Sequence, residues 1–166
     1  MKRTKLLALA LAGVMVLALL TGCSDSSSKA KQVEECFRSL MKQRGDYQKD
    51  ETLDKKLEGI AQQFQPDWLD DRNGGLTEDA RNIIRDELSD YVIAGGVTPW
   101  VGEVKPGQSA LAQAESMKKC RGLKYDVSYG SQPLYAIAFT MTGEKSDGHR
   151  YYLALVMKAT VKTPQT

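Results

Sequence analysis

The chain has 166 residues, with 23 Lys or Arg against 21 Asp or Glu and one His, a formal charge of +2 at pH 7. Outside the first 22 residues the count is 20 basic against 21 acidic residues, so bulk charge gives no support for nucleic-acid binding. Residues 23–100 carry 11 basic against 16 acidic residues, and residues 101–166 carry 9 against 5. This asymmetry indicates either an acidic helical layer beside a basic sheet, or a basic surface for an anionic partner such as lipid headgroups or cell-wall polymer.

The N-terminus reads as an export signal. Lys2, Arg3 and Lys5 precede an uncharged apolar run over residues 6–20. Fifteen residues suit the apolar core of a signal peptide but fall short of the roughly 20 needed to cross a bilayer. We therefore predict a cleaved signal peptide over residues 1–22, with an uncleaved anchor helix as the alternative.

The end of the apolar run, Leu20-Thr21-Gly22-Cys23, resembles the lipobox of bacterial lipoproteins. The resemblance implies cleavage before Cys23, diacylglycerol on its thiol and a fatty acyl group such as palmitate on the new amino group. Several acyl chains would hold the protein at a membrane without a spanning helix. Ser24 follows the cysteine, where Asp would resemble an inner-membrane retention signal. The implied location is the periplasmic face of the outer membrane, or the cell membrane in an organism without an outer membrane.

The polar segment "SDSSSKAK" predicts a flexible tether, so that residues 23–31 hold the lipidated cysteine and tether and residues 32–166 form a single domain. Apolar residues at helical spacing then predict amphipathic helices over residues 31–44 and 51–64, and from Thr77 to the Gly95-Gly96 pair. A short strand is expected around residues 100–104, and a weaker helix over residues 109–119.

From residue 123 onward the apolar period changes to two. Alternating stretches at residues 123–130, 134–143 and 150–162 are separated by segments rich in Gly, Ser and Pro, which predicts antiparallel strands joined by turns. The fold class predicted is α+β, with three to four N-terminal helices packed on one face of a C-terminal antiparallel meander of three or four strands.

With Cys23 lipidated, Cys36 and Cys120 remain. Two thiols in an oxidising compartment favour one disulfide, and two buried free thiols are the alternative. The sequence lacks a CxxC motif, which weighs against a redox pair.

No stretch carries a complete catalytic, cofactor or metal motif. The acidic stretch "DWLDDRNGGLTED" places Leu69 and Ala80 where an EF-hand needs ligands, so an interhelical turn is favoured, with Asp70 and Asp71 as a loose cation site at most.

His149, the only histidine, is expected to be a solvated hairpin residue. Trp68 and Trp100 are expected to cover a small core rather than to anchor an interface.

Tyrosines recur in the predicted strands, where they form either a stacking surface or ordinary cross-strand pairs. The set comprises Tyr125, Tyr129, Tyr151 and Tyr152.

The function predicted is that of a lipid-anchored, non-enzymatic periplasmic protein that binds another envelope component. Its partners would be the membrane, through acyl chains on Cys23, and a protein or envelope polymer, with no cofactor and no nucleic acid. An inhibitor or immunity lipoprotein that neutralises an enzyme is the alternative. A cell-envelope hydrolase that uses His149 with an Asp is a further one.

Overall fold

The structure, a computed structural model, describes residues 26–126 and 131–162. The lipobox with Cys23, the preceding signal segment and Tyr129 lie outside the described residues. The elements in chain order are α2 (Ser26–Lys42), α3 (Glu51–Gln63), η1 (Pro66–Trp68), β1 (Leu69–Asp70), η2 (Asp71–Asn73), β2 (Gly75–Leu76), α4 (Glu78–Leu88), β3 (Val92–Glu103), α5 (Ala110–Glu115), β4 (Lys118–Lys119), β5 (Leu123–Tyr125), β6 (Ser131–Met141) and β7 (Tyr151–Lys162). Among the described helices, none has the length and apolar character that crossing a membrane requires.

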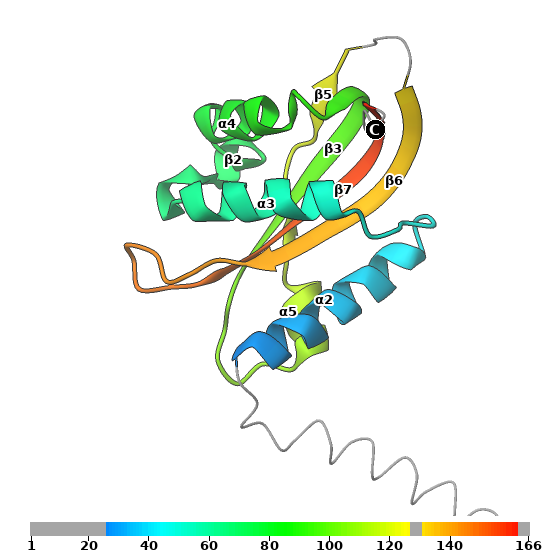
Figure 1. Cartoon of the computed structure of the whole chain (residues 1–166). Helices are drawn as coiled ribbons and strands as arrows, with labels where there is room; N and C mark the ends of the chain where they lie inside the picture. Colours follow the sequence, from blue (N-terminus) through cyan, green and yellow to red (C-terminus); the bar gives the residue numbers. More distant parts are fainter. Residues whose placement is uncertain (1–25, 127–130, 163–166) are drawn as a thin grey trace, which may run out of the picture.

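Helices and an antiparallel sheet confirm the α+β class (Figure 1). The long strand β3 lies in the centre of a five-stranded sheet, paired with β7 on one side and with the short strands β4 and β5 on the other. β6 and β7 form a hairpin, with β6 at the far edge. The order differs from the expected meander, because β3 separates β5 from the β6–β7 hairpin.

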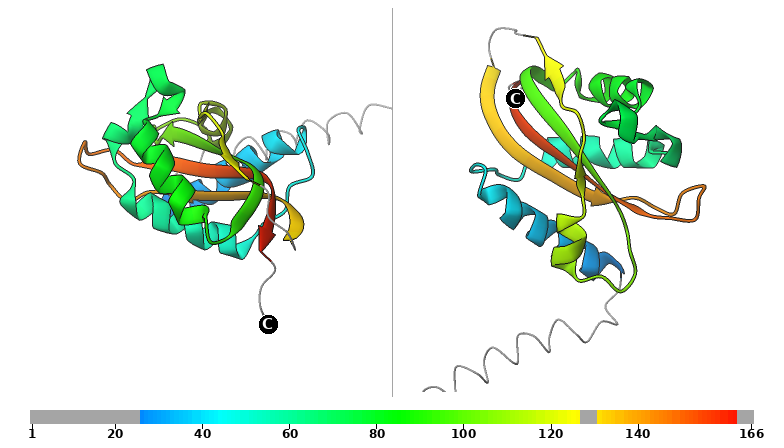
Figure 2. Two further views of the ribbon diagram at one scale, coloured as in Figure 1. Left: turned by 90° about the horizontal axis from the view of Figure 1, so that it is seen from above. Right: turned by 180° about the vertical axis from the view of Figure 1, so that it is seen from behind.

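Helices cover both faces of the sheet, which corrects the expectation that they pack on one face (Figures 1 and 2). α3 and α4 pack on one face around Leu57, Phe64 and Leu155, and we call this the first core. α2 and α5 pack on the other around Phe37, Ala114 and Tyr152, and we call this the second core. Alternate residues of β7 enter opposite cores, since side chains of a strand point in turn to its two faces. The sheet is therefore buried on both sides over much of its length.

α2 begins at Ser26, so the expected flexible tether is wrong for residues 26–31, which are helical. Val33, Phe37 and Met41 recur at a spacing of four residues and are buried against the sheet. A helix that begins three residues after Cys23 leaves at most about 10 Å of chain between this residue and the folded domain.

α3 spans nearly the predicted residues, with the Asp50 carboxylate accepting from the Leu53 amide at 2.8 Å as its N-cap. α4 has the predicted Thr77 N-cap but ends at Leu88. Gly95 and Gly96, expected to close this helix, lie inside β3 instead. The expected helix over residues 109–119 contracts to the six residues of α5.

Candidate functional site

A hollow opens on the second-core side of the sheet, beside the C-terminal end of α2. Its volume is about 420 Å³. We call it the basic hollow, and it is lined by Met41, Arg44, Tyr47, Gly96, Thr98, Trp100, Lys119, Val156 and Lys158. These residues come from the end of α2, the loop that follows it, and strands β3, β4 and β7.

Strand register brings the lining together. Gly96 lies opposite Lys158 of β7, and Trp100 lies opposite Lys119 of β4. Val97 and Val101 point into the first core, so Gly96, Thr98 and Trp100 face the hollow by alternation. A Cβ placed on Gly96 would meet only the Leu123 carbonyl oxygen, at 3.9 Å, so the missing side chain leaves the floor of the hollow open.

Two of the three cations are held over aromatic rings. The Arg44 guanidinium lies 5.8 Å from the Trp100 ring centroid, and Lys158 Nζ lies 5.6 Å from that of Tyr47. Trp100 itself packs edge-on against Phe37, with centroids 5.4 Å apart. Cation–π contacts of this kind restrict long, flexible side chains and so reduce the entropy cost of ordering them around a ligand.

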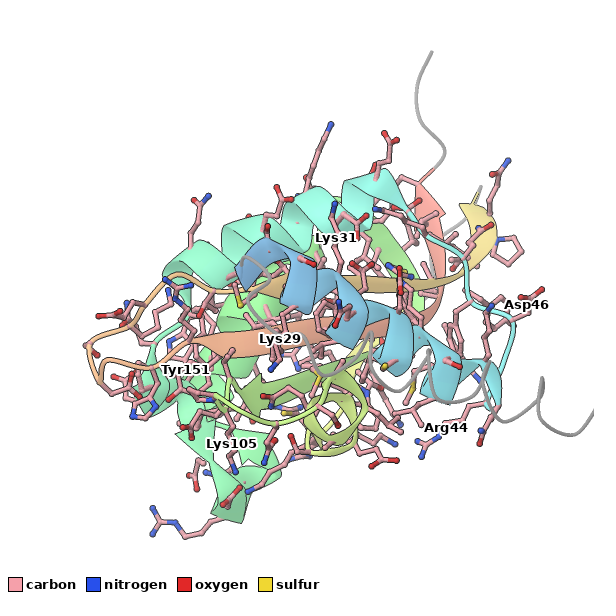
Figure 3. The ribbon with its side chains drawn as sticks, turned by 90° about the horizontal axis from the view of Figure 1, so that it is seen from below. Lys29, Lys31, Arg44, Asp46, Lys105 and Tyr151 are labelled. Carbon is pink, nitrogen blue, oxygen red and sulfur yellow. The ribbon has the colours of Figure 1, made fainter. Side chains whose placement is uncertain are left out.

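The basic hollow carries positive charge without compensation. Within the described part of the chain, no carboxylate lines it, and Arg44, Lys119 and Lys158 form no ion pair. Figure 3 shows Arg44 beyond the end of α2, far from Lys29 and Lys31, with Asp46 on the loop that follows. Concave surfaces with charge of one sign attract and concentrate ligands of the opposite sign.

A second hollow, of about 310 Å³, lies at the other end of β3 and has mixed charge. Three of the four charged side chains that line it are paired, and Lys105 forms no ion pair among the described residues. Lys118 Nζ lies 3.2 Å from Asp71 Oδ1, and His149 Nδ1 lies 2.9 Å from Glu103 Oε1. The mixed hollow therefore has less unsatisfied charge to offer a ligand than the basic hollow.

His149 is an exposed residue of the β6–β7 hairpin, as predicted. Its side chain is 52% exposed, and its backbone N–H donates to Asp147 Oδ1 at 3.0 Å. The other Asp147 oxygen accepts from the Tyr151 hydroxyl, and this hydrogen bond lowers the pKa of Asp147. The carboxylate beside the imidazole is that of Glu103, whereas the carboxylate of Asp147 is held by the turn and Tyr151. Among the described residues, no Asp side chain is paired with the His149 imidazole as the hydrolase hypothesis would require.

The predicted disulfide between Cys36 and Cys120 is wrong. Both thiols are free, because Cys36 packs beside the second core and Cys120 belongs to the first core, on the opposite side of the sheet. Burial raises the pKa of the Cys120 thiol to about 11.

The acidic stretch forms the turn that the sequence predicted. Gly74 and Gly75 have positive φ angles of 76° and 101°. Asp70 accepts from the Arg72 amide at 2.9 Å and from Asn73 Nδ2 at 2.7 Å, which lowers the pKa of its carboxyl. These carboxylates thus serve the loop and, for Asp71, the pair with Lys118.

The tryptophans pack as expected, Trp68 in the first core and Trp100 beside the second. The stacking surface proposed for the tyrosine pairs is not present at Tyr151 and Tyr152, which are buried in opposite cores. Sequence reasoning did not single out Arg44, Tyr47, Lys119 or Lys158. The basic excess of the C-terminal segment was the available signal, and it could not place these residues together.

Comparisons of the chain with protein-family models, curated proteins and solved structures give no match. The candidate site therefore depends on the geometry of this chain alone.

Proposed function

We propose that this chain is a lipid-anchored, non-enzymatic protein of the periplasmic face of the outer membrane that binds an anionic component of the cell envelope in the basic hollow. The observation that carries the binding role is a concave site surrounded by three cations, Arg44, Lys119 and Lys158, that have no carboxylate partner in the described part of the chain. An isolated surface lysine would be ordinary, but cations ordered over aromatic rings at a hollow are suited to an anionic ligand.

The anchor supports the location. The Leu20-Thr21-Gly22-Cys23 motif resembles a lipobox, and the folded domain begins close behind it, with α2 at Ser26. Acyl chains on Cys23 would keep the domain close to the periplasmic surface of the membrane, where it can reach an envelope ligand.

The anchor is tested with a Cys23→Ala variant. We expect the parent to carry the mass of acyl chains on residue 23 by mass spectrometry and to sediment with membranes. The variant should carry no lipid mass and should leave the membrane fraction on washing with salt. A variant that stays in the membrane as the parent does, together with an unmodified Cys23 in the parent, would overturn the proposed anchor.

The binding role is tested by sedimentation of the full chain, released in neutral detergent, with isolated envelope fragments at low salt. We expect the double variant Arg44→Gln/Lys158→Gln to reduce the bound fraction about tenfold relative to the parent. The control Lys31→Gln/Lys55→Gln removes the same charge from exposed sites on α2 and α3 and should bind like the parent. Equal loss in both double variants would show nonspecific attraction and overturn the role of the hollow.

A further inference from the structure

We infer that the ligand of the basic hollow is a linear polyanion, which runs from the hollow across the open sheet face to Lys124 on β5. This inference rests on the proposed binding of an anionic envelope component and names its chemical class. It is carried by the positions of the cations on the sheet and by the open path between them.

Lys124 lies on the same face of the sheet as the hollow. Its neighbours Leu123 and Tyr125 pack on the first-core side, so alternation directs Lys124 to the opposite face. Lys124 is opposite Gly96 in the pairing of β5 with β3, and Lys158 is opposite Gly96 in the pairing with β7. Lys124 is exposed and forms no ion pair among the described residues.

The spacing of these lysines exceeds what one small anion can bridge. Two strand spacings separate Lys124 from Lys158, about 10 Å between backbones. Lys119 is paired with Trp100, four residues along β3 from Gly96, which is about 13 Å. A single phosphate or carboxylate would reach one or two of these cations, whereas a chain with repeated negative groups would reach all of them.

No β3 side chain stands between Lys124 and Lys158. Gly96 lies between Lys124 and Lys158 and has no side chain, and its Cβ position is free of side-chain contacts within 4 Å. Tyr135 continues the surface on β6, where it is paired with Lys158 and is 52% exposed. A polymer chain therefore meets no obstruction from a β3 side chain where it crosses the sheet at Gly96.

The position of the hollow favours a polymer over the headgroups of the anchoring bilayer. α2 has 17 residues and is therefore about 25 Å long. Its N-terminal end follows Cys23 closely in the chain, and the hollow lies beside its C-terminal end. Figure 3 shows Lys29 near the start of α2 and Arg44 beyond the other end of this helix. A concave site at the far end of the helix is better placed for a chain extending from the envelope than for a flat lipid surface.

The test uses the full chain with a Trp68→Phe substitution in neutral detergent, so that Trp100 fluorescence reports binding at the hollow. The probes are long-chain polyphosphate and orthophosphate, compared at equal phosphate concentration. We expect polyphosphate to bind at least about tenfold more tightly per phosphate. The slope of log K against log salt should lie at roughly −2 to −3, since each contact on a single-stranded polyanion contributes about −0.7.

Lys124→Gln should weaken polyphosphate binding about three- to tenfold and reduce the size of the salt slope by about 0.7, with orthophosphate binding unchanged. Lys55→Gln, on α3 at the other face, is the matched control and should change neither. Equal affinity per phosphate for the two probes, or no effect of Lys124→Gln, would overturn the polymer inference while leaving a small-anion site intact. A Trp100 fluorescence change with phosphatidylglycerol in mixed micelles that phosphatidylcholine does not produce, without any response to polyphosphate, would also overturn it, in favour of a lipid surface. Failure of all three probes to bind would remove the proposed anion-binding function as well.

Discussion

At the scale of single residues, Gly95 and Gly96 differ in what surrounds them although they are adjacent. Gly95 has a φ angle of +107°, and a Cβ there would lie 2.5 Å from the Lys158 carbonyl oxygen and 2.7 Å from the Ala159 Cα. Both are backbone atoms of β7, so they cannot move aside without parting the strands. Gly96 has open space at its Cβ position apart from one oxygen at 3.9 Å.

We therefore expect Gly95→Ala to lower the free energy of unfolding by about 2–5 kcal/mol, from backbone strain together with overpacking. Gly96→Ala is the matched control and should change it by less than about 1 kcal/mol. Urea unfolding followed by circular dichroism measures both. Equal effects of the two substitutions would contradict the packing described at Gly95.

The two free thiols lead to a second expectation at this scale. Cys120 is 2% exposed and burial raises its pKa to about 11, whereas Cys36 is partly exposed, with its pKa also raised by burial. In the folded protein at pH 8, iodoacetamide should alkylate Cys36 first, and Cys120 only after addition of denaturant. Mass spectrometry of peptides from unreduced protein measures both sites. A Cys36–Cys120 disulfide peptide would contradict the structure.

The burial of Cys120 also determines the direction in which the stability of the folded protein changes with pH at alkaline pH. Because its folded-state pKa lies above the ordinary value of 9.0, the folded state retains the thiol proton to higher pH than the unfolded chain. Its contribution to stability is complete below about pH 9 and declines as the pH rises toward 11. A Cys120→Ala variant should show a weaker decline of stability over this interval than the parent.

At the scale of elements, α3 has no basic residue in its own last turn, and a lysine from a distant segment contacts this end of the helix instead. Lys145, on the β6–β7 hairpin, donates from Nζ to the Ala61 and Gln62 carbonyl oxygens at 2.9 and 3.2 Å. A cation at the C-terminal end of a helix satisfies free carbonyls and interacts favourably with the helix dipole.

Lys145→Met keeps the aliphatic stem and removes the ammonium, so we expect a loss of about 1–2 kcal/mol of unfolding free energy. Lys55→Met, exposed on the same helix, should change it by less than about 0.5 kcal/mol. Thermal denaturation of the three proteins in parallel measures this. A Lys145→Met protein with the melting temperature of the parent would show that the hairpin does not cap α3.

The sequence predicted an element correctly where local signals, such as an apolar stripe, a cap or a proline, were enough to determine its type and its ends. α3 has a regular apolar stripe, an Asp50 N-cap and Pro66 shortly after its end, and its predicted bounds match the structure closely. α4 and β3 were misjudged because Tyr91 and Val92 continue the apolar stripe and the Gly pair resembles a helix stop. Pairing with β7, which local signals do not show, assigns these residues to a strand instead.

At the scale of the whole molecule, helical periodicity shows which side of a helix is buried but not which face of the sheet it covers. That limit explains why the helices were expected on one face, and why the sequence did not show that Cys36 and Cys120 lie on opposite sides of the sheet. The basic hollow likewise depends on distant segments, since Arg44, Lys119 and Lys158 come together only through the sheet register and the end of α2.

The two cores share one sheet, and this predicts how the molecule unfolds. Strand β7 inserts Tyr151 into the first core and Tyr152 into the second, so loss of either core removes packing from this inner strand. Each core also contains or borders one tryptophan, Trp68 for the first and Trp100 for the second. Single domains of this size commonly unfold in one cooperative transition.

We therefore expect the variants Trp68→Phe and Trp100→Phe, each with one remaining tryptophan, to report the two cores separately by fluorescence. Within each variant, the urea midpoint from fluorescence should coincide with that from circular dichroism, which follows the whole fold. If Trp100 fluorescence changed at a lower urea concentration than the circular dichroism of the same variant, α2 and α5 would leave the sheet first. The basic hollow would then lie on a separately unfolding unit, since Arg44 and Tyr47 follow α2.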